Sequence, residues 1–378
     1  MGEWSVHQLF REAKPILGVD GAKSLQAYAS GIRKNGFPVI FTLNHLAKIV
    51  GINYQLLYLS INRKRESSNY RIFTISKRSG GKRYIHAVTE DLRITQMFIN
   101  SEILQKTTPH PSSYAFHPSG GVLECAKAHC GARWLFQYDL SNFFYHVSET
   151  KIFEIFLKMG YRRLLAFELA RICTTTRMPK HLHSHLKWLT KERQEEFKFY
   201  RGKKVGILPQ GAPTSPMLAN LAAFELDESL AAVAQQYGLT YTRYADDLTF
   251  SCGDDQLDSI SIKKIHRAIV SSIVKNGFLV NESKHRIARP GSKKIVLGLL
   301  IDGDKPRISR ETYKRIDRLL YAVEKFGYEA VATHENLDSP IGLYNHIQGL
   351  LGFVKSTDTE RWAEFKRKFD AIESPWAL

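Results

Sequence analysis

The sequence contains no long hydrophobic run and only a few cysteines. No apolar stretch reaches the roughly 18 to 20 residues that span a bilayer, and the first residues, Met1 to Ser5, lack the basic-then-apolar order of a secretory signal. Four cysteines in 378 residues are too few for a disulfide framework and are typical of reduced thiols. We therefore expect a cytoplasmic protein that crosses no membrane.

Acidic residues are also in short supply, which leaves the chain strongly basic. The balance of 54 Lys and Arg against 37 Asp and Glu gives a formal net charge of +17, which indicates a polyanionic partner, with nucleic acid as the first candidate. Hydrophobic residues make up 43% and charged residues 24%, which excludes a largely disordered chain. The length suits several subdomains around a shared core.

The first half of the chain changes from helical to strand periodicity. Residues 1–65 read as helical, and the two short helices on either side of Gly51 fit either a helix-turn-helix or an ordinary helical hairpin. Alternation then predicts strands at 70–75 and 83–87, joined by a tight turn at Gly80-Gly81. Four basic residues crowd this turn and suit it to phosphate, although an exposed basic turn without a ligand has the same pattern: Lys77, Arg78, Lys82 and Arg83.

Further helices are predicted at 89–106, 123–129 and 151–175, and residues 180–204 read as a polar, exposed insertion. Two groups of histidine and cysteine raise the question of a metal site. His181, His183 and His185 alternate without a fourth ligand, and Cys125, His129 and Cys130 have no second ligand pair downstream. Neither spacing provides a fixed ligand geometry, so we interpret neither as a metal site.

Three carboxylates carry the strongest chemical signal. Asp246 and Asp247 sit in a predicted tight turn between two strands, and Asp139 ends the apolar, aromatic run that begins at Trp134. Adjacent like charges cost stability unless a cation offsets them. We expect Asp139 and Asp246 to share metal ions, with Asp247 assisting. Two Mg²⁺ ions about 4 Å apart would activate a hydroxyl and stabilise a leaving pyrophosphate, and Mn²⁺ is an expected substitute.

A loop upstream of this turn opens into a predicted long helix, from Met217 to about Gln236. Ser215 is the expected N-cap and Pro216 the first helical residue. Gln210 and Gly211 precede it, and the free amides of a helix N-terminus beside a glycine let a nucleotide or template backbone approach closely.

Three stretches together resemble core palm motifs of reverse transcriptases, in the same order and at fitting separations. They are Asp139 followed by Phe143-Phe144, Gln210-Gly211-x-Pro-x-Ser-Pro with Asn220, and Tyr244-Ala245-Asp246-Asp247. The basic hairpin resembles the preceding fingers motif. Asn281 and Lys284 are similar to the next palm element, and Val296-Leu297-Gly298-Leu299 resembles the strand that grips the primer.

Within that family the chain most resembles the bacterial retron group. The shared features are its small size, the wording Pro213-Thr214-Ser215-Pro216 and a short helical thumb after residue 308. Two signatures depart from the group: Asn-Ala-x-x-His is replaced by Cys125-Ala126-Lys127-Ala128-His129, and Val-Thr-Gly by Val296-Leu297-Gly298.

The resemblance implies an α+β right-hand polymerase with fingers, an antiparallel palm sheet and a short helical thumb, preceded by a helical N-terminal extension. The implied bounds are 1–65 for the extension, 66–130 and 150–205 for the fingers, 131–149 and 206–302 for the palm, and 303–378 for the thumb. It also implies a noncoding RNA partner that is copied, from one of its own 2′-hydroxyls, into a branched RNA–DNA hybrid, and a separate effector protein in a defence system against phage.

Individual roles follow from the same resemblance. The backbone carbonyl of Leu140 would be a further metal ligand, and Phe144 would be the steric gate that rejects ribonucleotides. Lys284 would protonate the pyrophosphate. Contacts to the incoming triphosphate are expected from Lys77, Lys82 and Arg83, and Arg78 would contact nucleic acid.

The predicted thumb helix, residues 307–326, pairs an apolar face with a basic one. Arg310, Lys314 and Arg318 on the basic face suit a nucleic-acid backbone, although an ordinary packed helix has the same pattern. Two alternatives stay open at this point. One is a diversity-generating or intron-type reverse transcriptase, and the other is an RNA-binding or toxin-restraining scaffold that keeps the polymerase fold.

Overall fold

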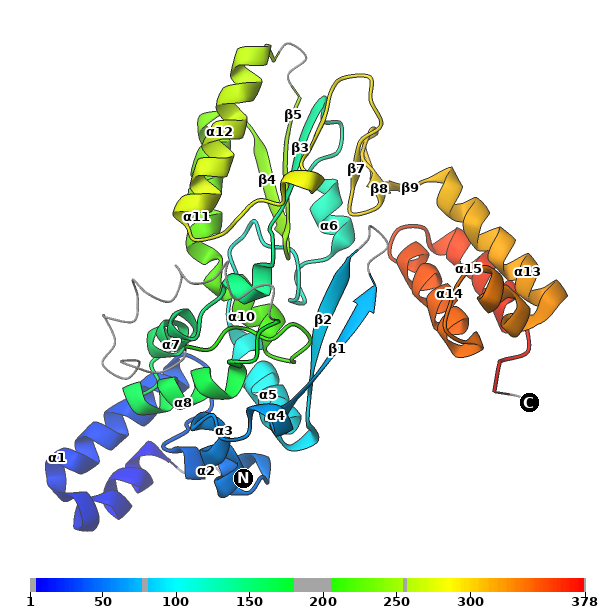
Figure 1. The fold of residues 1–378 in the computed structure, drawn as a ribbon. Helices are drawn as coiled ribbons and strands as arrows, with labels where there is room; N and C mark the ends of the chain where they lie inside the picture. Colours follow the sequence, from blue (N-terminus) through cyan, green and yellow to red (C-terminus); the bar gives the residue numbers. More distant parts are fainter. Residues whose placement is uncertain (1–4, 77–80, 180–204, 254–256, 377–378) are drawn as a thin grey trace.

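The computed structural model describes residues 5–76, 81–179, 205–253 and 257–376 (Figure 1). The predicted triphosphate and nucleic-acid contacts Lys77 and Arg78, and the histidines at 181, 183 and 185, lie outside the described residues. No helix of the described part is long and apolar enough to cross a membrane.

A four-stranded antiparallel sheet organises the centre of the molecule, in the order β4-β5-β3-β6. Its strands are β3 (Trp134–Asp139), β4 (Thr240–Tyr244), β5 (Asp247–Cys252) and β6 (Arg286–Ala288). Alternate residues of β3 face opposite sides of the sheet. Trp134, Phe136 and Tyr138 are buried on one side, and Leu135 and Asp139 are buried on the other, where Gln137 is partly exposed. The strand that ends at Asp139 and the hairpin at Asp246 are thus confirmed as elements.

Helices cover this sheet on both faces (Figure 1). On one face, α11 (Phe224–Gln236) and α12 (Ser259–Lys275) pack their apolar residues against Phe136, Tyr138 and Phe250 of the strands. On the other face, α6 (Val122–Lys127) packs Cys125 and Ala126 against Leu135. The open end of that second face carries Asp139, and this is where the candidate site lies.

A long two-stranded hairpin stands beside the sheet, made of β1 (Tyr70–Ser76) and β2 (Lys82–Val88) in antiparallel register from Tyr70↔Val88 to Ser76↔Lys82. The predicted hairpin is therefore confirmed. The helices at its base share the large core with the sheet. They are α5 (Glu90–Glu102), η1 (Leu104–Lys106), η2 (Phe143–His146), α7 (Glu149–Lys158), α8 (Arg163–Cys173) and α10 (Ser215–Ala222).

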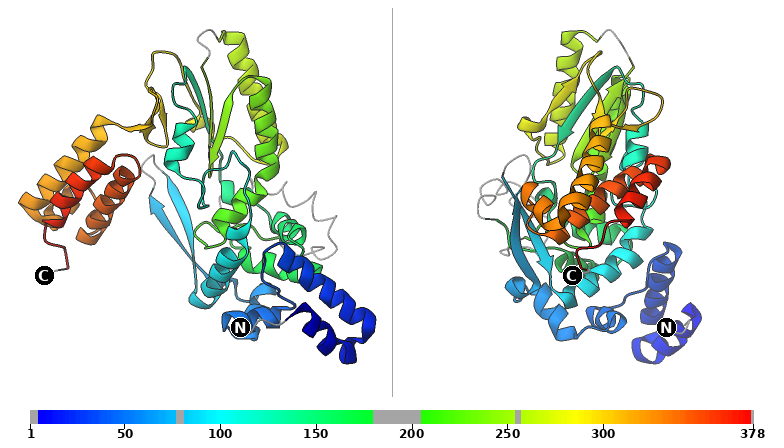
Figure 2. Two further views of the ribbon diagram at one scale, coloured as in Figure 1. Left: turned by 180° about the vertical axis from the view of Figure 1, so that it is seen from behind. Right: turned by 90° about the vertical axis from the view of Figure 1, so that its right-hand side faces the viewer.

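The N-terminal region is helical as predicted: α1 (Val6–Lys34), α2 (Leu43–Val50), α3 (Tyr54–Ile61) and α4 (Glu66–Asn69). Gly18 breaks α1 with φ +68°, so α1 folds as two helical pieces (Figure 2). Gly51 ends α2 in the left-handed conformation, and α2 and α3 form a short helical hairpin. The Tyr161 hydroxyl donates to the carbonyl of Pro38 at 3.1 Å, which ties this region to the body of the protein.

The C-terminal region begins with η5 (Glu282–Lys284) and a small sheet of β7 (Ile295–Val296), β8 (Leu299–Leu300) and β9 (Arg307–Ile308). Three helices follow and lie off to one side of the central sheet (Figures 1 and 2). They are α13 (Arg310–His334), α14 (Pro340–Lys355) and α15 (Thr359–Asp370). Their buried apolar residues belong to the same cluster as those of the small sheet, α6 and Leu135 of β3.

Several sequence predictions about element bounds are wrong in detail. The long helix from Met217 is two helices, because Ala223 leaves helical geometry (φ −84°, ψ 4°). Ser215 is not the N-cap: Thr214 holds that position, and the buried Ser215 hydroxyl instead donates to the carbonyl of Pro209 at 2.7 Å. The helix predicted to reach Lys106 ends at Glu102 and is followed by the short 3₁₀ helix η1.

Two corrections concern the C-terminal region. The stretch predicted as one strand at Val296 to Leu299 is a hairpin, because Leu297 (φ +49°) and Gly298 (φ +88°) form its tight turn. The helix predicted from Arg307 starts at Arg310, since Arg307 and Ile308 are paired in β9. It then continues past Phe326 to His334, with a break at Gly327.

Candidate active site

Backbone pairing brings the three predicted carboxylates to one end of the central sheet. In the β3–β5 ladder Asp139 is the direct partner of Asp247, so their side chains leave the same face. Asp246 lies in the β4–β5 turn, and its carbonyl accepts a hydrogen bond from the amide of Leu140 at 2.9 Å. Residues that are 107 positions apart thus meet because β3 pairs with β5.

The turn that carries Asp246 has unusual backbone geometry. Ala245 adopts φ +57°, in the left-handed region that non-glycine residues rarely occupy. Such conformations cost about 1 kcal/mol or more and persist where the surrounding structure holds them. The strain therefore sits on the residue directly before a predicted metal ligand.

A cavity of about 600 Å³ opens in front of Asp139 and Asp246, whereas Asp247 does not line it. The cavity lies between the β1–β2 hairpin and the end of the central sheet. Its lining includes eight of the predicted site residues or their neighbours: Arg83, Asp139, Leu140, Phe143, Phe144, Gln210, Asp246 and Lys284. Ile75, Ile85, Asn142 and Asn281 complete much of the wall, and none of these four was among the predicted site residues.

Burial, together with neighbouring like charges, perturbs the pKa values of two of these aspartates. Desolvation and the neighbouring carboxylates of Asp246 and Asp139 raise the pKa of Asp247 to about 6. Desolvation, aided by the charge of Asp139, also raises the pKa of Asp246. Both shifts show that the ionised pair is unfavourable in the protein alone, as expected where a cation belongs.

Asp139 has two polar partners from the segment after α12. Its Oδ1 lies 2.5 Å from the ammonium of Lys284, and its Oδ2 accepts a hydrogen bond from the amide of Asn281 at 3.0 Å. The hydrogen bond to Asp139 raises the pKa of Lys284. Both oxygens of Asp139 are therefore engaged, and the ammonium of Lys284 competes with a metal ion for this carboxylate.

The donor chemistry fits divalent metal ions that prefer oxygen. Among the described residues, no three His, Cys, Asp or Glu side chains are gathered closely enough to hold an ion without adjustment. The three aspartates nevertheless lie at one end of one sheet, and exchanging Lys284 for a cation would relieve their mutual repulsion. Hard carboxylate oxygens around a water-accessible cavity suit Mg²⁺, which keeps several waters and needs few protein ligands.

The loop before α10 forms another wall of the cavity. The carbonyl of Gln210 accepts a hydrogen bond from the amide of His86 in β2 at 2.8 Å. Gly211 has φ +106°, and a Cβ placed there would lie 2.9 Å from the Ile85 side chain. A glycine is thus required where this loop passes the hairpin.

The two adjacent phenylalanines after β3 have different environments. Phe143 is buried and packs against Phe278, whereas Phe144 is half-buried. Both side chains line the cavity, but Phe144 has the greater exposed surface. This placement is compatible with Phe144 as the predicted steric gate and Phe143 as the core residue.

The remaining predicted contacts divide into two groups. Arg83 lines the cavity, whereas Lys82, one position earlier on β2, is exposed and does not line it. Arg310, Lys314 and Arg318 are exposed on α13 at intervals of four residues, so they share one face of that helix. They belong to the C-terminal helical group and do not line the cavity.

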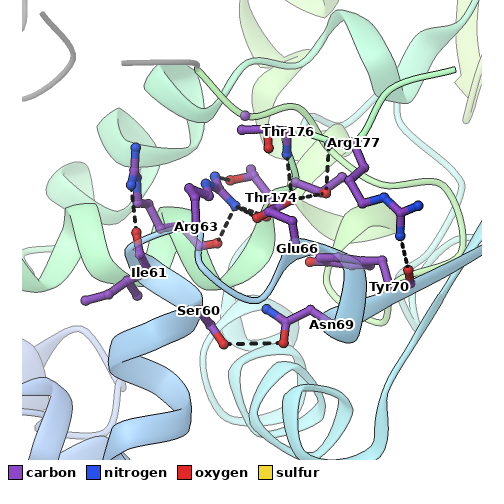
Figure 3. Close-up of polar contacts among 12 residues, drawn as sticks. Ser60, Ile61, Arg63, Glu66, Asn69, Tyr70, Thr174, Thr176 and Arg177 are labelled. Atoms are coloured by element: carbon purple, nitrogen blue, oxygen red, sulfur yellow. Dashed lines mark hydrogen bonds and ion pairs between the residues drawn. The ribbon is translucent and has the colours of Figure 1, made fainter. Parts of the chain in front are cut away.

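A buried ionic network fixes the base of the β1–β2 hairpin (Figure 3). Glu149 is fully buried between Arg63, at 2.5 Å, and Arg171, at 2.8 Å. Burial alone would raise its pKa, but the two guanidinium groups hold the pKa of Glu149 below the usual value. The network also reaches the hairpin, since the Arg177 guanidinium donates to the carbonyl of Tyr70 at 2.7 Å.

Sequence reasoning missed a second buried ion pair, which lies directly beneath the carboxylates. Arg243 and Asp227 are both fully buried and form a bidentate pair, with Nε at 2.7 Å and Nη2 at 2.6 Å from the two carboxylate oxygens. The available signal was an arginine two residues after Tyr241 in a predicted strand, on the same side of β4 as that buried ring, where burial requires an acidic partner.

His129, which we did not interpret as a metal ligand from the sequence, has a structural role. It is buried, with Nδ1 2.7 Å from the Ser251 hydroxyl and Nε2 2.7 Å from the Thr242 hydroxyl. It therefore bridges β5 and β4 on the α6 face. Desolvation lowers the pKa of His129 to about 4, so the ring is neutral at physiological pH.

Comparison with known proteins agrees with this geometry. Residues 75–314 match the family described as reverse transcriptase (RNA-dependent DNA polymerase). The chain is 31% identical to the retron Ec86 reverse transcriptase of Escherichia coli over 87% of this chain and 88% of that protein. It is 32% identical to the retron Mx65 reverse transcriptase of Myxococcus xanthus over 89% of this chain and 73% of that protein.

A solved structure of Candida albicans telomerase with a telomeric RNA fragment overlaps with a TM-score of 0.39. It has 12% identity over 80% of this chain and 56% of that chain, which is too low to equate individual residues. The family match spans the central sheet, β2 and the three carboxylates. Together with the sequence relatives, it shows that this chain belongs to the reverse transcriptase family, as a homologue of the retron reverse transcriptases, and is an RNA-directed DNA polymerase.

Proposed function

We propose that the chain adds deoxynucleotides to a primer by a two-metal mechanism in the cytoplasm, with Asp139, Asp246 and Asp247 holding two Mg²⁺ ions. The observation that supports this proposal is the convergence of the three carboxylates at one end of the sheet, where Asp139 and Asp246 line the cavity and the pKa values of Asp246 and Asp247 are raised. The carbonyl of Leu140 is a further candidate ligand. When bound, the ions would activate the primer hydroxyl and stabilise the leaving pyrophosphate, and Mn²⁺ would substitute.

The protein's own groups would orient the nucleotide. Arg83 lines the cavity and can bond to phosphate oxygens with two N–H groups, with Lys82 and Lys77 as further triphosphate contacts. Gln210 and Gly211 would face the base and sugar, and Phe144 would exclude a 2′-hydroxyl. Lys284 lies beside Asp139 and would donate a proton to the pyrophosphate.

Nucleic acid would run from the hairpin to the C-terminal helices. The proposed backbone contacts are Arg78, which lies between β1 and β2 in the sequence, and Arg310, Lys314 and Arg318 on one face of α13. We assign the extension to 1–65, the fingers to 66–130 and 150–205, the palm to 131–149 and 206–302, and the thumb to 303–378.

The similarity to retron enzymes supports a specific substrate. The proposed template is a structured noncoding RNA, copied into a branched RNA–DNA hybrid (msDNA) that is primed from a 2′-hydroxyl of that RNA. The complex would act with a separate effector protein in an antiphage system. The altered signatures at Cys125 to His129 and at Val296 to Gly298 keep a diversity-generating or group II-like enzyme as the alternative.

The test uses the full chain purified with its copurifying RNA, supplied with Mg²⁺ and labelled deoxynucleotides. RNase-sensitive DNA synthesis should fall by about a hundred-fold or more in Asp246→Asn, because a lost metal ligand removes several kcal/mol of charge stabilisation. Asp338→Asn, an exposed aspartate of the C-terminal region, is the matched control. Equal synthesis by Asp246→Asn would disprove the active site.

Analysis of the product separates the two kinds of reverse transcriptase. A retron enzyme should yield DNA joined to RNA through a 2′–5′ linkage, which a debranching enzyme releases. DNA with no such linkage would favour the alternative, and DNA synthesis absent from both the wild type and Asp246→Asn would favour a scaffold that keeps the fold.

A further inference from the structure

The buried arginine beneath the catalytic turn contacts three parts of the protein at once. Besides its bidentate pair with Asp227 of α11, the Nη1 of Arg243 donates to the side-chain oxygen of Asn220 in α10 at 2.9 Å. The same nitrogen donates to the carbonyl of Ala245 at 3.2 Å. Each contact uses a different direction of one planar group, which restricts both its position and its rotation.

The contact with Ala245 bears directly on the metal ligand. The Ala245 carbonyl belongs to the same rigid peptide plane as the amide nitrogen of Asp246. Holding that oxygen fixes the plane, and therefore the direction in which Asp246 leaves the backbone. Because Ala245 is held at φ +57°, this turn would lose strain by relaxing if the contact were removed.

The backbone of Arg243 is also held by hydrogen bonds. The amide of Arg243 donates to the carbonyl of Ser112 at 2.7 Å, and the carbonyl of Arg243 accepts from the amide of Tyr114 at 2.8 Å. The same loop accepts a hydrogen bond from the Asn220 side chain at the carbonyl of Ala115, at 2.6 Å. Hydrogen bonds around the guanidinium group of Arg243 thus join the loop at 112–115, helix α10 and the β4–β5 turn, and we call this set of hydrogen bonds the circuit.

This circuit also joins the turn to the nucleotide-binding wall. Helix α10 carries Asn220 and begins five residues after Gln210, directly after the loop that lines the cavity. A guanidinium that bonds both α10 and the turn sets the separation between the proposed nucleotide loop and the proposed metal ligand.

We infer that Arg243, neutralised by Asp227, is a positioning residue that aims Asp246 into the metal site and holds the catalytic turn at a fixed distance from α10. This inference rests on the proposed metal role of Asp246. Arg243 itself does not line the cavity and acts through the backbone carbonyl of Ala245.

The test is Arg243→Lys, measured by Mn²⁺ binding to the full chain without nucleotide, using the electron paramagnetic resonance signal of free Mn²⁺. Lysine retains a positive charge for Asp227, but its single ammonium cannot bond Asp227, Asn220 and Ala245 together. Mn²⁺ should bind about ten-fold more weakly, as is typical when support behind a metal ligand is lost. In synthesis assays kcat should fall more than the KM for deoxynucleotide rises.

Arg171→Lys is the matched control, because Arg171 is also a buried arginine paired with a buried acid, Glu149, but lies far from the turn in α8. It should lower the melting temperature and leave Mn²⁺ affinity unchanged. A folded Arg243→Lys protein with wild-type Mn²⁺ affinity would overturn the inference, as would an equal loss in Arg171→Lys.

Two further variants keep the test decisive. If Arg243→Lys does not fold, Asn220→Ala removes the two hydrogen bonds of the Asn220 side chain, to Arg243 and to the carbonyl of Ala115, and leaves the ion pair. It should weaken Mn²⁺ binding about five-fold, since the hydrogen bond to Arg243 contributes about 1 kcal/mol. Unchanged affinity there also overturns the inference. Asp246→Asn separates the two proposals. If this variant binds Mn²⁺ with wild-type affinity, the proposed metal site itself is wrong. If it loses Mn²⁺ binding while Arg243→Lys binds Mn²⁺ as the wild type does, only the positioning role of Arg243 is refuted.

Discussion

The ammonium of Lys284 lies 2.5 Å from the Oδ1 of Asp139, so a cation of the protein itself occupies one oxygen of a proposed metal ligand. Asn281 engages the other oxygen. The Lys284 side chain is about half exposed, at 47%, and Lys284 is the last residue of the short helix η5 rather than part of a strand of the central sheet. An exposed lysine can leave at little cost, so this pair can give way to a metal ion and free Lys284 to face the nucleotide phosphates.

Replacing this lysine should strengthen metal binding and weaken catalysis. Lys284→Met removes the competing cation, and Mn²⁺ should bind up to about five-fold more tightly, since a half-exposed ion pair contributes no more than about 1 kcal/mol. Synthesis at saturating metal should nevertheless slow, because the proposed proton donor is lost. Calorimetric titration with Mn²⁺ measures the first effect. Lys305→Met, which replaces an exposed lysine in a loop, is the control. Weaker Mn²⁺ binding by Lys284→Met would contradict the competition between Lys284 and the metal ion for Asp139.

The half-buried ring of Phe144 should set sugar selectivity. Phe144→Ala opens space in the cavity wall, and the preference for deoxyribonucleotides over ribonucleotides, measured as the ratio of kcat/KM values, should fall by at least about ten-fold. Phe116→Ala is the control, because the Phe116 ring contacts Phe144 at 6.4 Å between centroids but does not line the cavity. Unchanged selectivity in Phe144→Ala would remove the gate assignment.

His129 should make the protein sensitive to acid. Its pKa is lowered to about 4 in the folded state, against 6.5 for an unperturbed ring, so the unfolded chain binds a proton more readily. Its contribution is complete above pH 6.5 and is lost as pH falls from 6.5 toward 4, by at most about 3 kcal/mol.

Urea unfolding across this range measures the effect. His129→Gln retains an amide that can bond the hydroxyls of Ser251 and Thr242 but does not titrate, so its stability should depend less on pH between 6.5 and 4. His334→Gln, at an exposed histidine, should follow the wild-type curve. Identical pH profiles for wild type and His129→Gln would show that the ring is not held neutral.

Gly206 should be intolerant of any side chain. A Cβ at this position would lie 2.4 Å from Arg63 Nη2 and 2.6 Å from Glu149 Oε2, inside the buried network at the base of the hairpin. Gly206→Ala should lower the free energy of unfolding by about 2 to 3 kcal/mol, because crowded buried charges cannot move apart without losing their partners. Gly253→Ala is the control, because a methyl group added there meets open space. Equal urea midpoints for Gly206→Ala and Gly253→Ala would contradict the predicted crowding at Gly206.

Local patterns in the sequence were sufficient for much of the architecture. Alternation placed the β1–β2 hairpin, the apolar run placed β3, and the acidic turn placed the β4–β5 hairpin, because side-chain periodicity depends on a few neighbouring residues. Helix bounds were less accurate: the break at Ala223 and the change from strand to helix at Arg310 depend on tertiary packing and strand pairing, which periodicity does not record.

The sequence by itself determined which chemical groups the enzyme carries: three aspartates, two adjacent phenylalanines and a glycine loop at recognisable spacings. Only the tertiary structure decided their arrangement. The β3–β5 register sets Asp139 opposite Asp247, and Arg243 meets Asp227 from a different element. The ion pair between Asp139 and Lys284, which lies 145 positions later in the chain, likewise forms only when the chain folds. Such contacts join residues far apart in sequence, and their energies arise from burial and exclusion of water, which exist only once the chain has folded.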